Sequence, residues 1–255
     1  MKYTVGCVSD IGIKRTSNQD SFCYELATYQ GHNIAFMVIC DGMGGFSKGE
    51  LASAEAVKTF DHWFLNRMPQ ILKAGFSAEA LREEWYSMAE NINRRISEYA
   101  VSHGLKMGTT LTATLFLGTQ YYVLHIGDCR LYELRATDVI QLTHDHTVVQ
   151  REIDSGNLSP ADALHDTRQH ILLQCLGAGR DITPDFTVGT IHPGSGYLLC
   201  SDGFRHKFSS EEMLQLAPSP GATGKKLEKK LRSAIEQIKA RGETDNITCG
   251  LLAVT

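Results

Sequence analysis

The chain has 255 residues, of which 42% are hydrophobic and 21% charged, and its formal net charge is −4. This composition supports a sizeable core and excludes a chain that is disordered throughout. The negative balance argues against a nucleic-acid binder, because contacts with phosphates need a basic face. The N-terminus has no apolar signal segment, and no run approaches the ~18 apolar residues of a membrane span. We therefore expect a cytoplasmic protein without a membrane segment.

Cysteine usage also indicates a reducing compartment. The chain has seven cysteines, none of them in a Cys-x-x-Cys pair, and most lie inside apolar runs. This pattern fits buried free thiols and argues against a zinc site or a disulfide framework. Cys129, which follows Asp128, is the one cysteine expected to be exposed. We interpret it as a small turn residue rather than a nucleophile.

The first part of the chain predicts three strands and a helix. Apolar runs at residues 3–9, 21–26 and 34–40 indicate the strands, with residues 31–33 as the turn between the last two. Apolar residues at helical spacing then indicate a helix at about residues 49–66. This start is typical of an antiparallel sheet covered by a helix.

The middle of the chain predicts a long helix followed by a meander. The same helical spacing indicates the helix at about residues 78–102. Strands are predicted at residues 109–117, 121–126, 131–134 and 139–142, separated by short turns. Neighbouring strands joined by tight turns pair in the antiparallel sense.

The remainder mixes helices and strands. Predicted helices lie at residues 146–154, 209–217 and 223–240, predicted strands at 186–191, 197–200 and 247–254, and an irregular surface segment at 156–169. Helices thus come in pairs between runs of antiparallel strands, which excludes a doubly wound parallel sheet. We expect an α+β fold of two packed antiparallel sheets with helix pairs outside. Without a linker or repeat, residues 1–255 are predicted to be a single domain.

Four aspartates in turn segments are the most informative residues. Asp41, Asp128 and Asp202 each follow a predicted strand, and Asp245 precedes one. Carboxylates at strand ends can meet in space although they are far apart in the sequence. Several hard oxygen ligands at one sheet edge predict a site for Mg²⁺ or Mn²⁺.

The motifs around these aspartates resemble the metal-dependent Ser/Thr protein phosphatases of the PPM or PP2C family, in their compact bacterial form. The matching segments are Arg15-Thr16-Ser17-Asn18-Gln19-Asp20, Asp41-Gly42-Met43-Gly44-Gly45, Gly127-Asp128 and Ser201-Asp202-Gly203. The resemblance extends from Ser9 to Thr248. It implies a four-layer αββα sandwich that hydrolyses phosphoserine and phosphothreonine with water activated between two Mg²⁺ or Mn²⁺ ions.

The resemblance also assigns metal ligands. Asp41 would bridge the two ions, and the Gly42 carbonyl would bind the second. Asp202 and Asp245 would complete the shell of the first ion. Asp128, together with Asp202, would hold a weak third ion.

Two further residues receive catalytic roles by resemblance. Arg15 would grip the substrate phosphate, since a guanidinium offers paired donors to its oxygens, and Asp20 would orient the attacking water. Gln19 stands where many relatives have an acid, which makes a direct metal bond there doubtful. Residues 148–170 correspond to a flap over the site, where substrate choice would be determined. For His146 we favour packing or a helix start over metal binding.

This chain departs from relatives at two positions. Met43 replaces the histidine of animal members, so no side-chain acid is assigned and water is the expected proton donor. His206 replaces an acid near the third ion, and it either weakens that ion's site or points into solvent. The expected partners are phosphorylated proteins and a cognate bacterial Ser/Thr kinase. Two alternatives stay open: a catalytically silent binding module of the same fold, or a small-molecule phosphomonoesterase.

Overall fold

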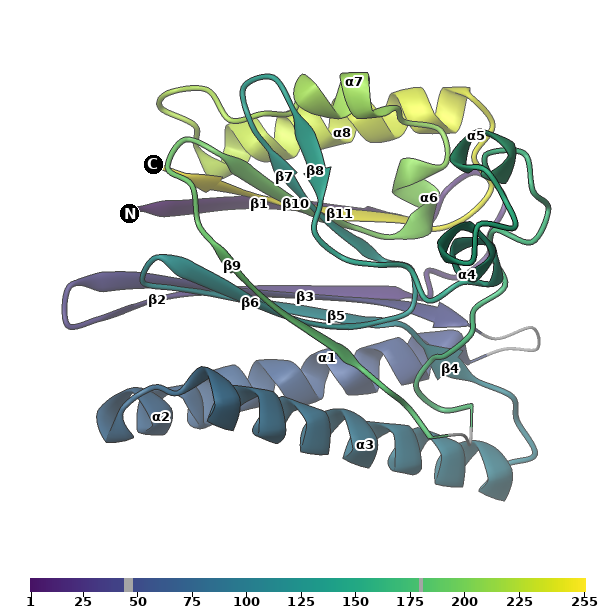
Figure 1. The fold of residues 1–255 in the computed structure, drawn as a ribbon, viewed down its shortest axis with the longest axis horizontal. Coiled ribbons are helices and arrows are strands. Elements are labelled where there is room, and N and C mark those ends of the chain that lie inside the picture. Colours follow the sequence, from purple (N-terminus) through teal and green to yellow (C-terminus); the bar gives the residue numbers. More distant parts are fainter. Residues whose placement is uncertain (44–47, 179–180) are drawn as a thin grey trace.

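Two antiparallel sheets lie face to face in the computed structural model, which describes residues 1–43, 48–178 and 181–255 (Figure 1). The first sheet has the order β1-β11-β10-β7-β8, with β1 at Tyr3–Asp10, β7 at Arg130–Leu134, β8 at Val139–Gln141, β10 at Gly196–Cys200 and β11 at Ile247–Val254. The second has the order β2-β3-β5-β6-β9, with β2 at Asp20–Tyr29, β3 at His32–Met43, β5 at Leu111–Leu117, β6 at Gln120–Ile126 and β9 at Asp185–Thr190. A short β4 at Gly108–Thr109 pairs with the end of β3.

Helices cover the outer face of each sheet (Figure 1). On the second sheet lie α1 at Gly49–Asn66, α2 at Met68–Ala74 and α3 at Ala78–Ser102. On the first lie α7 at Ser210–Leu214 and α8 at Gly224–Ala240. Three short helices gather at one end of the sandwich: α4 at Val148–Asp154, α5 at Pro160–Ala163 and α6 at Asp202–Arg205. Among the described residues, no helix is both long and apolar enough to cross a membrane.

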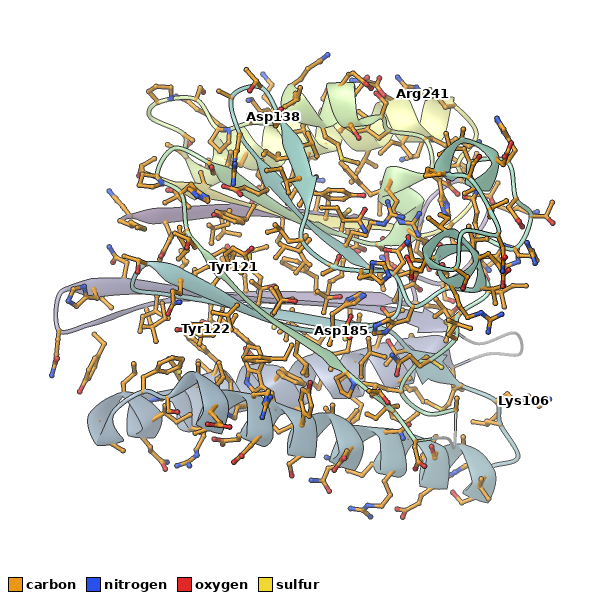
Figure 2. All side chains as sticks on the ribbon, in the orientation of Figure 1. Lys106, Tyr121, Tyr122, Asp138, Asp185 and Arg241 are labelled. Atoms are coloured by element: carbon orange, nitrogen blue, oxygen red, sulfur yellow. The ribbon has the colours of Figure 1, made fainter. Side chains whose placement is uncertain are left out.

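Three apolar clusters hold the layers together. Strand alternation sends Tyr121 between the sheets, where it packs with Tyr197, and sends the next residue, Tyr122, towards the helices (Figure 2). The cluster under α1 and α3 is centred on the fully buried Trp85, and the cluster under α8 contains Leu231. Because both sheets contribute to the middle cluster, burial of apolar area fixes one sheet against the other.

The predicted α+β sandwich of antiparallel sheets between helix layers is confirmed. The helices at 49–66 and 78–102 have the predicted bounds. The structure adds α2, α5 and α6, which were not predicted from the sequence. The helix expected from residue 146 begins at Val148, with Thr147 as its N-cap.

Three local predictions were wrong. The hairpin turn is Gln30-Gly31, where both residues have positive φ, rather than residues 31–33. Strand β3 does not end at residue 40, because Gly42 and Met43 pair with β4. Two of the aspartates are not in turns: Asp202 is the first residue of α6, and Asp41 lies inside β3.

The elements that carry the acidic residues converge at the end of the sandwich away from the chain termini (Figure 1). Asp20 begins β2 and lies opposite Asp41 in β3. Strand β10 leads into Asp202, and Cys200 at its end pairs with Cys249 near the start of β11. The segment before β11 carries Asp245, so antiparallel pairing brings it to the same end.

Candidate metal centre

A cavity of about 240 Å³ lies at this end of the sandwich. It is lined by Arg15, Gln19, Asp41, Gly42, Met43, Thr110, Asp128, His170, Leu172, Asp202 and Asp245. Six of the seven predicted site residues are therefore brought together. The seventh, Asp20, is not in this lining but lies beside Asp41 in the sheet.

Asp41 is fixed through its backbone. Its N–H donates to Thr110 Oγ1 at 2.8 Å, and its carbonyl oxygen accepts from Thr109 Oγ1 at 3.0 Å and from Thr110 N at 2.9 Å. The strand predicted at residues 109–117 therefore begins close to the site, with Thr110 between β4 and β5. The two threonines place the Asp41 carboxylate at the cavity wall.

Gly42 is required by close backbone packing. A Cβ at this position would overlap the carbonyl oxygens of Gly49 and Gln19. Gly42 N donates to Gln19 O at 3.0 Å, and the Gln19 amide, with its nitrogen facing Gly42, donates to Gly42 O at 3.3 Å. The carbonyl predicted to bind the second ion therefore has an amide neighbour where many relatives carry an acid.

The Ser201 hydroxyl holds Asp20 behind the cavity. Ser201 Oγ donates to Asp20 Oδ2 at 3.0 Å and accepts from Thr248 N at 3.0 Å. Ser201 is also the residue before Asp202. Ser201 therefore connects Asp20 to the end of β10, where the Asp202 carboxylate enters the cavity.

Asp245 is paired with Arg15. Arg15 Nε donates to Asp245 Oδ1 at 2.9 Å, and Nη2 donates to Oδ2 at 2.7 Å. The neighbouring Asn246 accepts from Gln19 N at 2.9 Å and donates to Ser17 O at 3.1 Å, so it fixes the segment that carries Arg15. In this structure the Arg15 guanidinium, predicted to bind phosphate, is thus hydrogen-bonded to Asp245, a predicted metal ligand.

Asp128 is held from two sides. The His146 ring accepts a hydrogen bond from Gly127 N through Nδ1 at 3.2 Å, and the backbone N–H of His146 donates to Gly127 O at 2.7 Å. On the other side, Arg205 Nη2 donates to Asp128 Oδ2 at 3.1 Å. His146 is buried, as expected for a packing residue. The prediction that Cys129 is exposed was wrong, because its side chain is fully buried below the turn.

The carboxylates raise one another's pKa. The pKa of Asp41 lies well above its usual range, first because the side chain is buried and then because Asp20, Asp202, Asp128 and Asp245 are close. Burial raises the pKa of Asp20 to about 7 and that of Asp128 to about 7, and the charge of Asp202 adds to both shifts. Several negative charges in one poorly solvated place favour a cation between them.

The donor set fits a hard divalent cation. Asp202 Oδ1 is buried and has no hydrogen-bond partner among the described residues, although buried polar atoms are normally paired. The facing donors are carboxylate oxygens, which Mg²⁺ and Mn²⁺ prefer. Among the described residues, no three His, Cys, Asp or Glu side chains are already arranged to hold an ion. Two of the carboxylates instead face arginines, so ion binding requires at least one side chain to move.

Sequence reasoning missed Arg205, which contacts Asp128 from beside the cavity, and His170, which lines the cavity. Arg205, in the turn of α6 after Asp202, gave a signal only as a charged residue inside a metal motif. His170 lines the cavity from the flap segment. His206 does not point away from the acids: its Nε2 lies 3.7 Å from Asp202 Oδ2 and its Nδ1 lies 3.6 Å from Glu243 Oε2. Although burial acts to lower the pKa of His206, the Glu243 hydrogen bond and the Asp202 charge raise it overall.

Comparison with known proteins assigns the family. Residues 13–240 match the sequence model described as protein phosphatase 2C. The chain is 31% identical over 248 residues to the serine/threonine protein phosphatase PstP of Mycobacterium tuberculosis, a match that covers 94% of this chain and 43% of PstP. It therefore spans less than half of that relative. The protein phosphatase PhpP of Streptococcus pneumoniae is 29% identical over 258 residues, covering 98% of this chain and 97% of PhpP.

Solved structures agree with this result. The serine/threonine phosphatase of Streptococcus agalactiae superposes with a TM-score of 0.86 at 26% identity and covers 100% of both chains. The catalytic domain of PstP in complex with 2 manganese ions superposes with a TM-score of 0.79 at 28% identity, covering 99% of each chain. The fold, the acidic cavity and the family match lead to one assignment: this chain belongs to the protein phosphatase 2C family.

Proposed function

We propose that the chain is a metal-dependent protein phosphatase that removes phosphate from phosphoserine and phosphothreonine in proteins. The observation that carries this proposal is the meeting of Asp41, Asp202 and Asp245 in one cavity of about 240 Å³, with Asp202 Oδ1 buried and unpaired among the described residues. Two Mn²⁺ or Mg²⁺ ions bound there would activate a water molecule and neutralise charge on the phosphoryl oxygens. The PstP catalytic domain, which has this fold, is known in complex with 2 manganese ions.

In this proposal each acidic residue has a distinct task. Asp41 would hold both ions because it lies at the centre of the carboxylate cluster, and the Gly42 carbonyl would bind the second ion. Asp202 and Asp245 bind the first ion. Asp20, restrained by Ser201, orients the attacking water without binding an ion.

Arg15 binds the substrate phosphate. Its guanidinium is half exposed at the cavity and presents two parallel donors, which now contact Asp245. A phosphate group offers the same paired acceptors as a carboxylate. An ion on Asp245 would neutralise its carboxylate, so that the two donors of Arg15 could bind the substrate phosphate instead.

The partners follow from the reaction. The substrates are phosphorylated proteins, and a bacterial Ser/Thr kinase supplies the phosphate that the chain removes. We treat residues 1–255 as one phosphatase domain, because both sheets contribute to the middle apolar cluster. Phosphorylation sites that accumulate in a deletion strain would identify the substrates and the kinase.

Phosphate release tests the proposed reaction. Chelator-treated protein should hydrolyse a phosphothreonine peptide and p-nitrophenyl phosphate after addition of Mn²⁺, and neither before it. Turnover without a metal, or no turnover with any divalent ion, would refute the proposal; the latter result is expected of a silent binding module. Hydrolysis of small monoesters without hydrolysis of the peptide would instead indicate a small-molecule phosphomonoesterase.

A further inference from the structure

Asp128 carries a cation of its own. We propose that the Arg205 guanidinium permanently occupies the place of a third divalent ion at Asp128, so that this chain uses two ions and a fixed arginine. The inference rests on the proposed two-ion function and deepens it. It also replaces the expectation from sequence that Asp128 holds a weak third ion.

The ion pair is buried and therefore costly to break. Arg205 Nη2 lies 3.1 Å from Asp128 Oδ2, and the two side chains are only 9% and 5% exposed. The same nitrogen lies 3.6 Å from Asp145 Oδ2. Charges removed from water in this way are weakly screened, and separating them leaves a buried charge without a partner.

A second arginine lies in the same buried group. Asp145 receives two further bonds from Arg130, from Nε at 2.8 Å and from Nη2 at 2.6 Å. Asp202 faces both Asp128 and Arg205. A divalent ion added to Asp128 would bring two more positive charges next to the two guanidinium groups.

The distances put a divalent ion on Asp128 in competition with the Arg205 guanidinium. An ion such as Mg²⁺ binds a carboxylate oxygen at about 2.1 Å. Because Arg205 Nη2 lies 3.1 Å from Asp128 Oδ2, an ion on that oxygen would be at most about 5 Å from the guanidinium, with little water between them. An ion on the other oxygen would still share one carboxylate with the guanidinium, which contacts Oδ2.

Both partners are anchored. Arg205 ends the short helix α6, which begins with Asp202, so its backbone position is tied to a core ligand. A Cβ at Gly203 would overlap Asn246 O, which shows how tightly α6 packs against the segment before β11. Asp128 is fixed by the two hydrogen bonds between His146 and Gly127.

The opposing possibility is that a third ion displaces the arginine. A neighbouring cavity of about 280 Å³, lined in part by Arg205, Arg130, Asp145 and His206, offers space on the flap side. Displacement would leave Asp128 to the ion and move the guanidinium into that cavity. Ion stoichiometry separates the two possibilities.

Calorimetric Mn²⁺ titration of the chelator-treated full chain provides the test. We expect two equivalents for the wild type and three for Arg205→Met, with the extra equivalent lost again in the double variant Arg205→Met/Asp128→Asn. Arg67→Met, which removes a surface ion pair with Glu84 on α3, is the matched control and should leave two equivalents. Three equivalents in the wild type, or an unchanged number in a folded Arg205→Met, would overturn the proposal.

A second variant decides the matter if Arg205→Met fails to fold. Asp128→Asn keeps the arginine and removes the carboxylate charge. If Arg205 occupies the site, the number of bound Mn²⁺ ions stays the same as in the wild type; a loss of one equivalent would overturn the proposal. Peptide dephosphorylation is measured separately, so two bound ions without phosphate release would refute the proposed function and leave this inference standing.

Discussion

The two arginine–aspartate pairs of the cavity differ in their exposure to water. In the Arg15–Asp245 pair the side chains are 49% and 33% exposed, whereas in the Arg205–Asp128 pair they are 9% and 5% exposed. An exposed pair contributes little to stability and exchanges partners easily, while a buried pair is costly to break. Arg15 makes two hydrogen bonds to Asp245, at 2.9 and 2.7 Å, whereas Arg205 contacts Asp128 at 3.1 Å. We nevertheless expect Arg15 to be the arginine that leaves its carboxylate, because its pair is exposed.

The largest effect is expected where no arginine competes for the carboxylate. Asp41→Asn keeps the size of the side chain but removes the charge that would hold two ions together. We expect a loss of Mn²⁺-dependent activity of at least about 10³-fold, roughly 4 kcal/mol of barrier, with the fold retained. Phosphate release and circular dichroism measure the two parts. A folded variant with more than about a tenth of wild-type turnover would remove Asp41 from the metal centre.

Breaking the buried pair should destabilise the protein. Arg205→Met leaves Asp128 without its closest cation, and removing one partner of a buried pair costs about 3 kcal/mol or more. Urea denaturation of the metal-free protein measures this change. Adding Asp128→Asn should restore part of the loss, because neither charge is then unpaired. Additive effects of the two substitutions would show that the pair is not coupled.

Burial of His125 also predicts that the unfolding free energy depends on pH. The rings of His125 and His146 are tilted against each other, with centroids 5.0 Å apart. The pKa of His125 is lowered to about 4, first by burial and then by the charge of His146, while the facing carboxylates Asp145 and Asp185 act in the opposite direction. In the unfolded chain His125 binds a proton near pH 6.5, which the native state does not accept until about pH 4.

Stability should therefore fall as the pH falls through this window. Lowering the pH from 7 to 5 should reduce the unfolding free energy by about 2 kcal/mol through His125. His125→Gln cannot titrate, so its stability should change less over the same range. Denaturation at both pH values in a chelator measures the difference. Equal changes in wild type and variant would contradict the assigned shift.

The smallest change in stability is expected at the exposed pair. Arg15→Ala should alter the unfolding free energy by less than about 1 kcal/mol. Its main effect should be a raised KM for the phosphopeptide with a smaller fall in kcat and unchanged Mn²⁺ affinity. Steady-state kinetics and calorimetry separate these quantities. A collapse of Mn²⁺ affinity would make Arg15 a support of the metal centre instead of a phosphate ligand.

The sequence predicts features that depend on residues close together in the chain better than features that depend on residues far apart in it. Apolar spacing is local, so the long helices and the core strands were predicted with nearly correct bounds. The aspartates could be selected because each flanks a strand. The arginine pairs could not, because they join residues 230 and 77 positions apart, and which carboxylate each arginine meets depends on the folded layers.

The errors have the same origin. The strand predicted at residues 34–40 was too short, because pairing with β4, whose residues lie far along the chain, extends β3 through Gly42 and Met43. Cys129 follows an acidic turn residue and looked exposed, yet the turn packs it beneath Thr110, whose Oγ1 lies 3.2 Å from its Sγ. A polar neighbour in the sequence did not indicate a polar surrounding in space.

A crystal structure of the Mn²⁺-loaded protein, with manganese located by anomalous scattering, tests the central comparison most directly. We predict two manganese ions at Asp41, one of them bound to Asp245 with Arg15 released from that carboxylate. Arg205 should remain on Asp128, and no manganese should contact Asp128. A manganese ion bound to Asp128 with Arg205 turned away, or Arg15 still paired with Asp245 beside two bound ions, would contradict the account.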